Sequence, residues 1–449
     1  MKPINRRDFL GTTATGAAAI AGVAQTTRKA RPAGQAPSPQ TRIALPRDPN
    51  RRLATGLIGC GWFGMVDLKA ALQAGGVEAV ALCDVDSQHL SDAVAEVQKL
   101  QAQTPKGFKD YRELLKTPGL DVVIIATPPQ WHALPFIAAC EQGLDVYCEK
   151  PLAYDIREGR AMVNAARAAK NVVQIGFQRR NSLASAQAAD YIRQGLAGKI
   201  IQVEAEINYT APLESNVIQD PPPSLDWDFW CGPAPKLPYC PNIGHRTWRL
   251  EVNYGNGHMV DWGIHWLDAI RRILGLGAPD TIQAMGGIYR LRGKITTPDV
   301  LVAVFEFDSL PVIWRHRLWG STELDRSMTN RAVFYGDKET VVVTDSRWAV
   351  MPGGKESQLK VIEAPTAQPS AIHMMNFLEC VRSRGTPICE PSDGYLSTII
   401  PQLGMISYHA GAKIKWDAQA EQIPDNPNAS KLLKRDYRAP WKHPANAFA

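Results

Sequence analysis

Three side chains have the types needed to oxidise an alcohol: Lys150, Asp261 and His265. Lys150 follows a short apolar run, so we expect it at the end of a buried strand, where an ammonium can stabilise a developing negative oxygen. His265 is suited to accept an alcohol proton because histidine titrates near neutrality. Asp261 precedes it by four residues on a predicted helix and is expected to orient or charge-stabilise the imidazole. On the residues alone, an ordinary strand end and a surface Asp–His pair remain open alternatives.

A glycine-rich turn predicts where a dinucleotide would bind. Gly59, Gly61 and Gly64 have the spacing GxGxxG between an apolar run, 53–58, and a helical stretch. The first glycine permits a tight turn, the second lets backbone N–H groups approach a pyrophosphate, and the third lets the helix pack on the strand. Asp84 ends the next apolar run, where a carboxylate accepts hydrogen bonds from a ribose and repels a 2′-phosphate. The sequence therefore predicts NAD, with NADP as the less favoured cofactor.

The elements that must position these groups form two domains. Continuous apolar runs that alternate with helical stretches predict a buried parallel sheet, the doubly wound α/β arrangement. These runs lie at 53–58, 77–83, 121–126, 145–148 and 171–176, with helices at 87–103 and 132–142. After residue 176 the strands alternate with period two, which predicts an α+β domain with a large, mainly antiparallel open sheet. We assign 53–175 to an NAD-binding Rossmann domain and 176–449 to a substrate and oligomerisation domain, closed by helices near 371–384 and 392–412.

The N-terminus has the features of an export signal. Arg6 and Arg7 precede a weakly hydrophobic stretch of Ala, Gly and Thr, so residues 1–24 resemble a bacterial twin-arginine signal peptide. This stretch is too short to span a membrane. Residues 25–52 are rich in proline and are expected to form an arm or linker. We therefore expect a periplasmic protein that the twin-arginine machinery exports already folded, with its cofactor loaded in the cytoplasm; a basic, unprocessed terminus is the alternative.

Composition excludes several other classes of protein. The 449 residues are 45% hydrophobic and 21% charged, which is typical of a globular chain and excludes a disordered or polytopic membrane protein. The net charge of +6 is scattered, so no nucleic-acid partner is expected. No metal site is expected from the spacing of His, Cys, Asp and Glu. The eight cysteines favour free thiols, although Cys231 with Cys240, or Cys380 with Cys389, would suit a disulfide in an oxidising compartment.

The order of these motifs resembles the Gfo/Idh/MocA family over roughly residues 53–412. The landmarks are GxGxxG, Thr127-Pro128 with His132, Glu149-Lys150-Pro151, Gly176-Phe177-Gln178-Arg179-Arg180 and Asp261-x-Gly-x-His265. The resemblance implies that Lys150, Asp261 and His265 form the catalytic set. It also implies a homo-oligomer built through the open sheet and an arm that helps to enclose the cofactor. Glucose–fructose oxidoreductase has tyrosine at the position of His265, so its particular chemistry does not transfer automatically.

The sequence and the resemblance together give two sets of binding residues. The residues expected to bind the cofactor are Gly59, Gly61, Trp62, Phe63, Gly64, Asp84, Thr127, Pro128, His132, Glu149, Lys150 and Gln178. The residues expected to bind substrate are Arg179, Arg180, Trp230, His245, Trp248 and Arg249, together with Lys150 and His265. Arginine donors and aromatic rings in a long loop suit a sugar, but a solvated basic turn and a packed aromatic cluster would have the same composition.

These expectations define one leading hypothesis and two rivals. The leading hypothesis is an exported NAD-dependent oxidoreductase that acts on CH–OH groups and removes hydride from a ring hydroxyl of a sugar, glycoside or cyclitol. Because free NAD is scarce outside the cytoplasm, its cofactor would be tightly bound and recycled in place. The rivals are a redox-assisted glycosidase and a non-catalytic sugar-binding protein with a relic Rossmann domain. The presence of both Lys150 and His265 favours net oxidoreduction.

Overall fold

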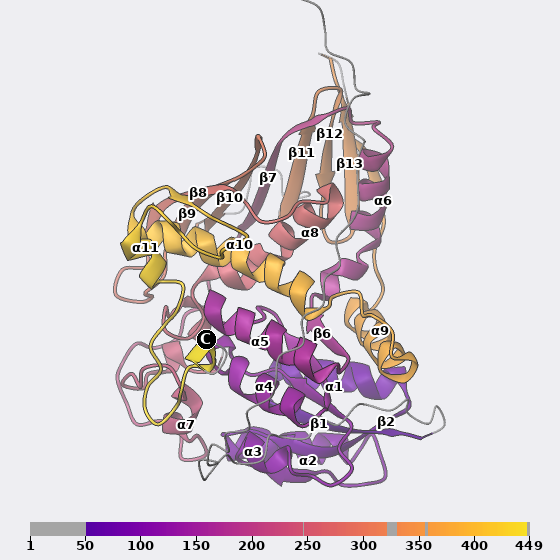
Figure 1. Cartoon of the computed structure of the whole chain (residues 1–449), viewed down its shortest axis with the longest axis vertical. Helices are drawn as coiled ribbons and strands as arrows, with labels where there is room; N and C mark the ends of the chain where they lie inside the picture. Colours follow the sequence, from indigo (N-terminus) through magenta and orange to yellow (C-terminus); the bar gives the residue numbers. More distant parts are fainter. Residues whose placement is uncertain (1–50, 246, 321–329, 355–357, 447–449) are drawn as a thin grey trace, which may run out of the picture. The chain divides into compact units, whose positions relative to one another are not determined.

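The protein contains a parallel sheet followed by a mainly antiparallel one (Figure 1). A computed structural model describes residues 51–245, 247–320, 330–354 and 358–446. The predicted export signal, and the predicted arm up to residue 50, lie outside the described residues. No helix in the described ranges is long and apolar enough to cross a membrane.

The first sheet has the strand order β3-β2-β1-β4-β5-β6, and every neighbouring pair is parallel. Its strands are β1 (Leu53–Ile58), β2 (Val77–Cys83), β3 (Lys106–Phe108), β4 (Val122–Ile125), β5 (Asp145–Glu149) and β6 (Val173–Gly176). The chain reverses its order after β3, so the carboxyl ends of β1 and β4 diverge and leave a crevice for a ligand. The predicted doubly wound domain is confirmed.

Helices cover both faces of this sheet, as its buried strands require. They are α1 (Trp62–Ala74), α2 (Ser87–Val97), α3 (Tyr111–Leu114), α4 (Ala133–Glu141) and α5 (Ile156–Ala169). Helix α2 ends earlier than the predicted 87–103. The reason is Gln101, whose side-chain amide donates to the carbonyl of Ala79 (2.8 Å) and accepts from its N–H (2.9 Å), so the chain after Val97 leaves the helix to meet β2.

The second sheet has nine strands in the order β14-β13-β12-β11-β7-β10-β9-β8-β15. They are β7 (Ile200–Asn208), β8 (Thr281–Gly287), β9 (Val300–Phe307), β10 (Leu310–Arg317), β11 (Arg331–Gly336), β12 (Glu339–Val343), β13 (Arg347–Pro352), β14 (Lys360–Glu363) and β15 (Ile414–Lys415). All pairs are antiparallel except β7 with β10. The predicted mainly antiparallel sheet is therefore confirmed.

One face of the nine-stranded sheet is buried and the other is exposed. Helices α6 (Leu183–Arg193), α8 (Ile264–Leu274) and α10 (Pro391–Ala410) pack on the buried face (Figure 1). Strand β9 alternates accordingly, with Phe305 fully buried and Val304 37% exposed. This period-two burial is what made the strands recognisable in the sequence.

Helix α9 (Pro369–Ser383) belongs by position to the second half of the chain but packs on the first sheet. Its residues Met374 and Phe377 share an apolar cluster with Leu57 of β1 and Met65 of α1. Figure 1 shows α9 beside the strands of the first sheet. The core of the first sheet is therefore completed by a helix from the second half of the chain, which lies in sequence between β14 and α10.

A long loop, residues 221–248, and the C-terminal tail contact each other beside the first sheet. The loop contains α7 (Trp227–Cys231), and its Phe229 ring stacks on Trp441 of the tail (centroids 5.9 Å apart, planes 7° apart). Arg438 of the tail donates to the carbonyls of Gly232 and Ala234 in the loop. Aromatic packing and these hydrogen bonds join the loop to the C-terminal tail.

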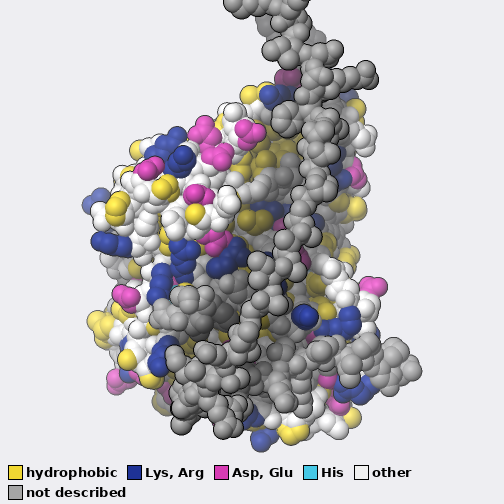
Figure 2. All heavy atoms as spheres, viewed as in Figure 1, with side chains coloured by type: hydrophobic (Ala, Val, Ile, Leu, Met, Phe, Trp, Pro, Cys, Tyr) yellow, Lys and Arg dark blue, Asp and Glu magenta, His cyan; other side chains and the backbone are white. Residues whose placement is uncertain are grey.

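The eight cysteines are all buried and free, and neither candidate disulfide forms. Cys231 instead lies 3.2 Å from the hydroxyl of Tyr254. Charges are spread over the face in Figure 2, where Lys and Arg side chains lie among Asp and Glu.

Candidate active site

The glycine turn after β1 has the geometry that a dinucleotide requires. Gly59 has φ +94°, and a side chain there would meet the backbone of Ala126 at 2.8 Å. A Cβ on Gly64 would lie 1.9 Å from the carbonyl oxygen of Gly59, so this glycine allows α1 to pack on the turn. A Cβ on Gly61 would meet nothing within 4 Å. Gly61 thus leaves open the space that a pyrophosphate needs, and the three predicted roles fit the geometry.

Asp84 is fixed at the end of β2 by the backbone around it. Its carboxylate accepts hydrogen bonds from the N–H groups of Cys60 (2.7 Å) and Asp86 (2.9 Å). Burial raises the pKa of Asp84, while these hydrogen bonds and the nearby His89 and His245 oppose the rise. The side chain is therefore oriented before any ligand arrives. Lys109, which also lines this part of the cavity, forms an ion pair with Asp226 (2.6 Å).

A cavity of about 330 Å³ joins this turn to the predicted catalytic residues. Its lining includes ten residues predicted for the cofactor: Gly59, Gly61, Trp62, Phe63, Asp84, Thr127, Pro128, Glu149, Lys150 and Gln178. It also includes Trp230, His245, Trp248, Arg249, Asp261 and His265. We call the part around Gly61 and Asp84 the nucleotide end, and the part around Lys150 and His265 the reaction end.

At the reaction end, Asp261 holds two cations in place. The ammonium of Lys150 donates to a carboxylate oxygen of Asp261 (2.9 Å) and to its backbone carbonyl (2.7 Å). The Nε of Arg249 lies 3.0 Å from the other carboxylate oxygen. Burial alone would raise the pKa of Asp261, but the charges of Lys150 and Arg249 outweigh it and lower the pKa. Asp261 is thus an ionised bridge that fixes the Lys150 ammonium.

The segment that carries Asp261 is not the continuous α-helix expected from the sequence. Residues Met259–Gly263 form a π-helical turn, and α8 begins only at Ile264. Such a turn rotates its residues relative to an α-helix, which frequently occurs at functional sites. Among the described residues, Asp261 contacts Lys150 and Arg249 rather than His265. The prediction that Asp261 orients the imidazole is therefore wrong, because the i, i+4 spacing does not have α-helical geometry here.

His265 is an unpaired base in a cationic setting. Its side chain is buried, and its Nδ1 has no hydrogen-bond partner within the part of the chain that the structure describes. Burial lowers the pKa of His265 well below 6.5, and the charges of Lys150 and Arg179 lower it further. The imidazole is consequently neutral at pH 7 and free to accept a proton.

Glu149 supports Lys150 from the strand below. Its carboxylate accepts hydrogen bonds from Gln178 (2.5 Å) and from the N–H of Lys150 (3.2 Å). Burial raises the pKa of Glu149 to about 7, against the opposing charge of Lys150. Glu149 and Gln178 therefore brace the end of β5 as well as lining the cavity.

Two of the three arginines predicted to bind substrate, Arg179 and Arg180, pair with carboxylates outside the cavity. Arg180 is fully buried and forms ion pairs with Asp268 (2.6 Å) and Asp393, so its predicted contact with substrate is wrong. Its guanidinium instead joins α8 to α10. Arg179 pairs with Asp345 (3.0 Å), and its guanidinium lies 5.7 Å from the ring centre of Trp262. Arg179 does not line the cavity, although its charge acts on His265.

Three other predicted residues have different positions from those expected. His132 is buried beneath the cavity, where its ring nitrogens lie 2.8 Å from the carbonyls of Thr127 and Pro151. His245 is at the nucleotide end, 3.0 Å from Asp86, and not beside Lys150. The ring of Trp230 lines the cavity but stacks on Trp227 (4.6 Å, 17°). Trp230 is therefore part of the cavity wall, His132 lies behind it, and His245 lines the nucleotide end.

Several residues of the cavity wall were not predicted from the sequence. His89, Lys109 and Trp131 line the nucleotide end, and Trp262 lines the reaction end. Trp262 follows Asp261 directly, and His89 lies five residues after Asp84, so proximity to these motif residues was a usable signal. Lys109 and Trp131 carried no such signal.

Family comparisons agree with this two-domain description. Residues 53–177 match the Gfo/Idh/MocA oxidoreductase family, described as an NAD-binding Rossmann fold. Residues 208–284 and 352–443 match the family's C-terminal alpha/beta domain. Fold and cavity thus define a two-domain oxidoreductase with an NAD-binding Rossmann fold. The chain belongs to the Gfo/Idh/MocA family.

Two kinds of curated relative are similar to part of the chain. A glycosyl hydrolase family 109 protein of Shewanella pealeana is 30% identical over 213 residues, or 45% of each chain. Inositol 2-dehydrogenase 4 of Saccharopolyspora erythraea is 31% identical over 166 residues, which are 36% of this chain and 48% of the relative. The chain spans less than half the length of these curated relatives.

Solved structures share the fold at low sequence identity. The aldose-aldose oxidoreductase of Caulobacter crescentus, complexed with glycerol, has a TM-score of 0.63 and 19% identity, covering 81% of this chain and 100% of that one. A levoglucosan dehydrogenase in complex with NADH and levoglucosan has a TM-score of 0.63 and 18% identity, covering 81% and 99%. These similarities show the architecture.

Proposed function

We propose that this protein is an exported, NAD-dependent dehydrogenase that oxidises a ring hydroxyl of a sugar, glycoside or cyclitol. The observation that carries the proposal is that one cavity is lined both by the glycine turn and Asp84 and by Lys150 and His265. Solved neighbours with NADH and levoglucosan or with glycerol support a polyol substrate.

The side chains at the reaction end divide the work of the oxidation. His265 accepts the hydroxyl proton, since its imidazole is neutral and its Nδ1 is unpaired in the described structure. Lys150 donates a hydrogen bond to the same substrate oxygen and stabilises the negative charge that develops as the proton leaves. NAD, held by the glycine turn and Asp84, supplies the hydride acceptor when bound.

Asp261 is a positioning residue in this scheme. The Lys150 ammonium donates one hydrogen bond to a carboxylate oxygen of Asp261 and one to its backbone carbonyl, so two of its three N–H donors are already used. The third remains available for the substrate oxygen. Because an ammonium on a four-carbon side chain otherwise has many rotamers, these two hydrogen bonds reduce the entropy lost on reaching the transition state.

Export sets a further condition on the cofactor. The twin-arginine pattern at Arg6 and Arg7 supports a periplasmic location. There, NAD would have to be tightly bound and reset in place by a second substrate or by reversal of the first oxidation. Ready exchange of free NAD and NADH during steady turnover would remove this part of the proposal.

The test is a single-turnover assay on the NAD-loaded protein with a panel of aldoses, cyclitols and glycosides, followed by absorbance at 340 nm. We expect absorbance to rise with at least one ring polyol in the wild type and not in Lys150→Ala. If the NAD-loaded wild type binds such sugars, as followed by calorimetry, yet gives no absorbance change, the dehydrogenase proposal is wrong.

A redox-assisted glycosidase is the second candidate, and the glycosyl hydrolase family 109 relatives favour it. Such an enzyme oxidises its substrate transiently, eliminates the aglycone and reduces the product again. Release of 4-nitrophenol from a chromogenic glycoside, by NAD-loaded protein with no external oxidant, would support it. A stable oxidised sugar with its leaving group intact would support net oxidoreduction.

A further inference from the structure

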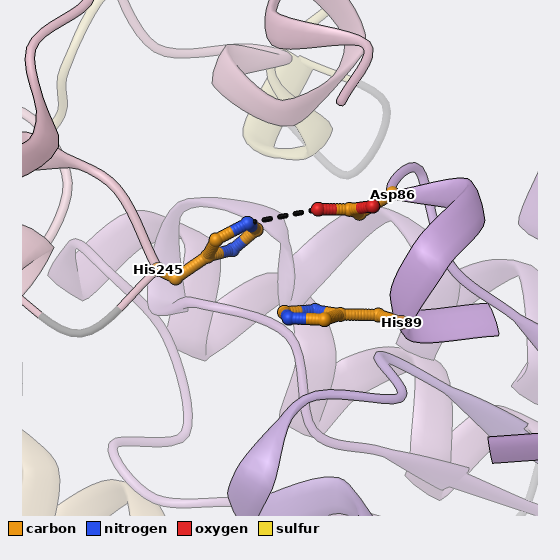
Figure 3. Close-up of side chains that lie close together, drawn as sticks. All are labelled: Asp86, His89 and His245. Atoms are coloured by element: carbon orange, nitrogen blue, oxygen red, sulfur yellow. Dashed lines mark hydrogen bonds and ion pairs between the residues drawn. The ribbon is translucent and has the colours of Figure 1, made fainter. Parts of the chain in front are cut away.

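Three potential metal ligands meet beside the nucleotide end: Asp86, His89 and His245 (Figure 3). Asp86 caps the N-terminus of α2, His89 lies in the first turn of α2, and His245 comes from the long loop. The Nε2 of His245 lies 3.0 Å from an oxygen of Asp86, and the two imidazole centroids are 4.3 Å apart. One ligand atom from each residue lies within 4.8 Å of the others.

This donor set and spacing suit a divalent transition metal. Two imidazoles and one carboxylate are preferred ligands of Zn²⁺, with bonds of about 2.0–2.2 Å. Around a tetrahedral ion such bonds place ligand atoms roughly 3.4 Å apart, so small side-chain rotations would bring these three into position. His245 is about one-third exposed, which leaves room for water as a fourth ligand.

The hydrogen bonds of Asp86 leave one of its oxygens facing the histidines. One carboxylate oxygen accepts from the N–H of Gln88 (2.9 Å), and the other lies 3.0 Å from the Nε2 of His245.

We propose that Asp86, His89 and His245 bind a divalent transition metal, Zn²⁺ by preference, that fastens the long loop to the nucleotide end of the cavity. A second group, Asp155, Glu158 and His443, has similar spacing. There the guanidinium of Arg435 already lies 2.8 Å from Glu158, and it supplies the positive charge that a metal would bring.

Metal and cofactor should assist each other. The N–H of Asp86 donates to Asp84, so a metal ligand and the expected ribose ligand are held by one short segment. A metal that fixes this segment and the loop should strengthen NAD binding, and NAD should strengthen metal binding by the same factor. Metal binding itself rests on side chains alone and does not require the proposed dehydrogenase activity.

The experiment uses the full chain, prepared without a polyhistidine tag and stripped with EDTA. Titration with Co²⁺ is followed by visible absorption, and Zn²⁺ is then added to displace it. We expect about one Co²⁺ per chain, with the intense bands of a four- or five-coordinate site and displacement by Zn²⁺. His89→Ala and His245→Ala should lose this site, while His409→Ala, a change at an exposed histidine outside the cluster, should keep it.

Two results would overturn the proposal. One is the absence of saturable Co²⁺ binding in the wild type; the other is equal binding in the wild type and His89→Ala. Thermal unfolding of the EDTA-treated variants shows whether each variant is folded. Without metal, His89→Ala should have a Tm close to that of the wild type, because His89 is partly exposed. Addition of Zn²⁺ should lower the Kd for NAD about tenfold in the wild type, and it should not change the Kd of His89→Ala.

Discussion

The two ends of the cavity are built in different ways. The nucleotide end is formed by backbone: Gly59, Gly61 and Gly64 shape the turn, and two N–H groups hold Asp84. The reaction end is formed by charged side chains from separate segments, and its ion pair joins Lys150 to Asp261 across 111 residues. The first end depends on local geometry, with no room for a side chain at Gly59 or Gly64, whereas the second depends on charges from distant segments.

The largest expected effect is at the reaction end. Lys150→Ala removes the donor that stabilises the developing oxyanion, so kcat for the best sugar should fall about a thousandfold. NAD affinity should change little, since Asp84 and the glycine turn remain. Calorimetric titration with NAD alongside single-turnover kinetics separates the two effects. Lys109→Ala, which removes a cavity-lining lysine at the nucleotide end, is the matched control and should retain kcat.

The next effect concerns the base. His265→Asn should lower kcat about a hundredfold. In the wild type the imidazole is neutral, and therefore active, above its lowered pKa, so kcat should stay constant as pH falls to 6.5 and decline only at more acid pH. This acid limb should disappear in His265→Asn. An acid limb that persists unchanged in His265→Asn would show that His265 is not the base.

A smaller effect distinguishes the two roles considered for Asp261. Asp261→Asn loosens the ammonium of Lys150, and we expect kcat to fall about thirtyfold through misplacement. The acid limb of the pH profile should not move to more acid pH, because no hydrogen bond joins Asp261 to His265 among the described residues. A limb displaced to more acid pH in Asp261→Asn would show that the carboxylate stabilises the protonated imidazole, the role predicted from the sequence.

The smallest effects are expected from two glycines at the nucleotide end. Gly64→Ala places a methyl group against the Gly59 carbonyl and should lower the free energy of unfolding by about 2 kcal/mol. Gly61→Ala has space for the methyl group and should leave unfolding within about 0.5 kcal/mol, yet weaken NAD about tenfold by filling the pyrophosphate position. Urea denaturation and NAD titration of the pair measure both. Equal stability of the two variants would contradict the packing role of Gly64.

The sequence predicted what is local. GxGxxG and Asp84 could be placed because strand, turn, helix and the next strand follow one another within 32 residues, from Leu53 to Asp84. The period-two strands of the second sheet were visible for the same reason. The helix near 371–384 could be predicted, but its packing on the first sheet could not, since no local pattern tells a helix which distant face it will cover.

Contacts between distant segments could not be predicted. The hydrogen bonds from Lys150 to Asp261 depend on a π-helical turn that no pattern in the sequence predicts. Arg179 and Arg180 are neighbours of the same type, but only Arg180 is enclosed by carboxylates of α8 and α10. Likewise, Asp86 and His245 are 159 residues apart, so no motif spacing could join them.

The most direct test of the account is the identity of the bound nucleotide. The full precursor is expressed, and the exported protein is purified with no cofactor added, denatured and analysed by mass spectrometry with absorbance at 340 nm. We expect near-stoichiometric NAD or NADH, held at the turn formed by Gly59, Gly61 and Gly64 and selected by Asp84. NADP would contradict the role given to Asp84, and an exported protein with an empty site would contradict the tightly bound, recycled cofactor.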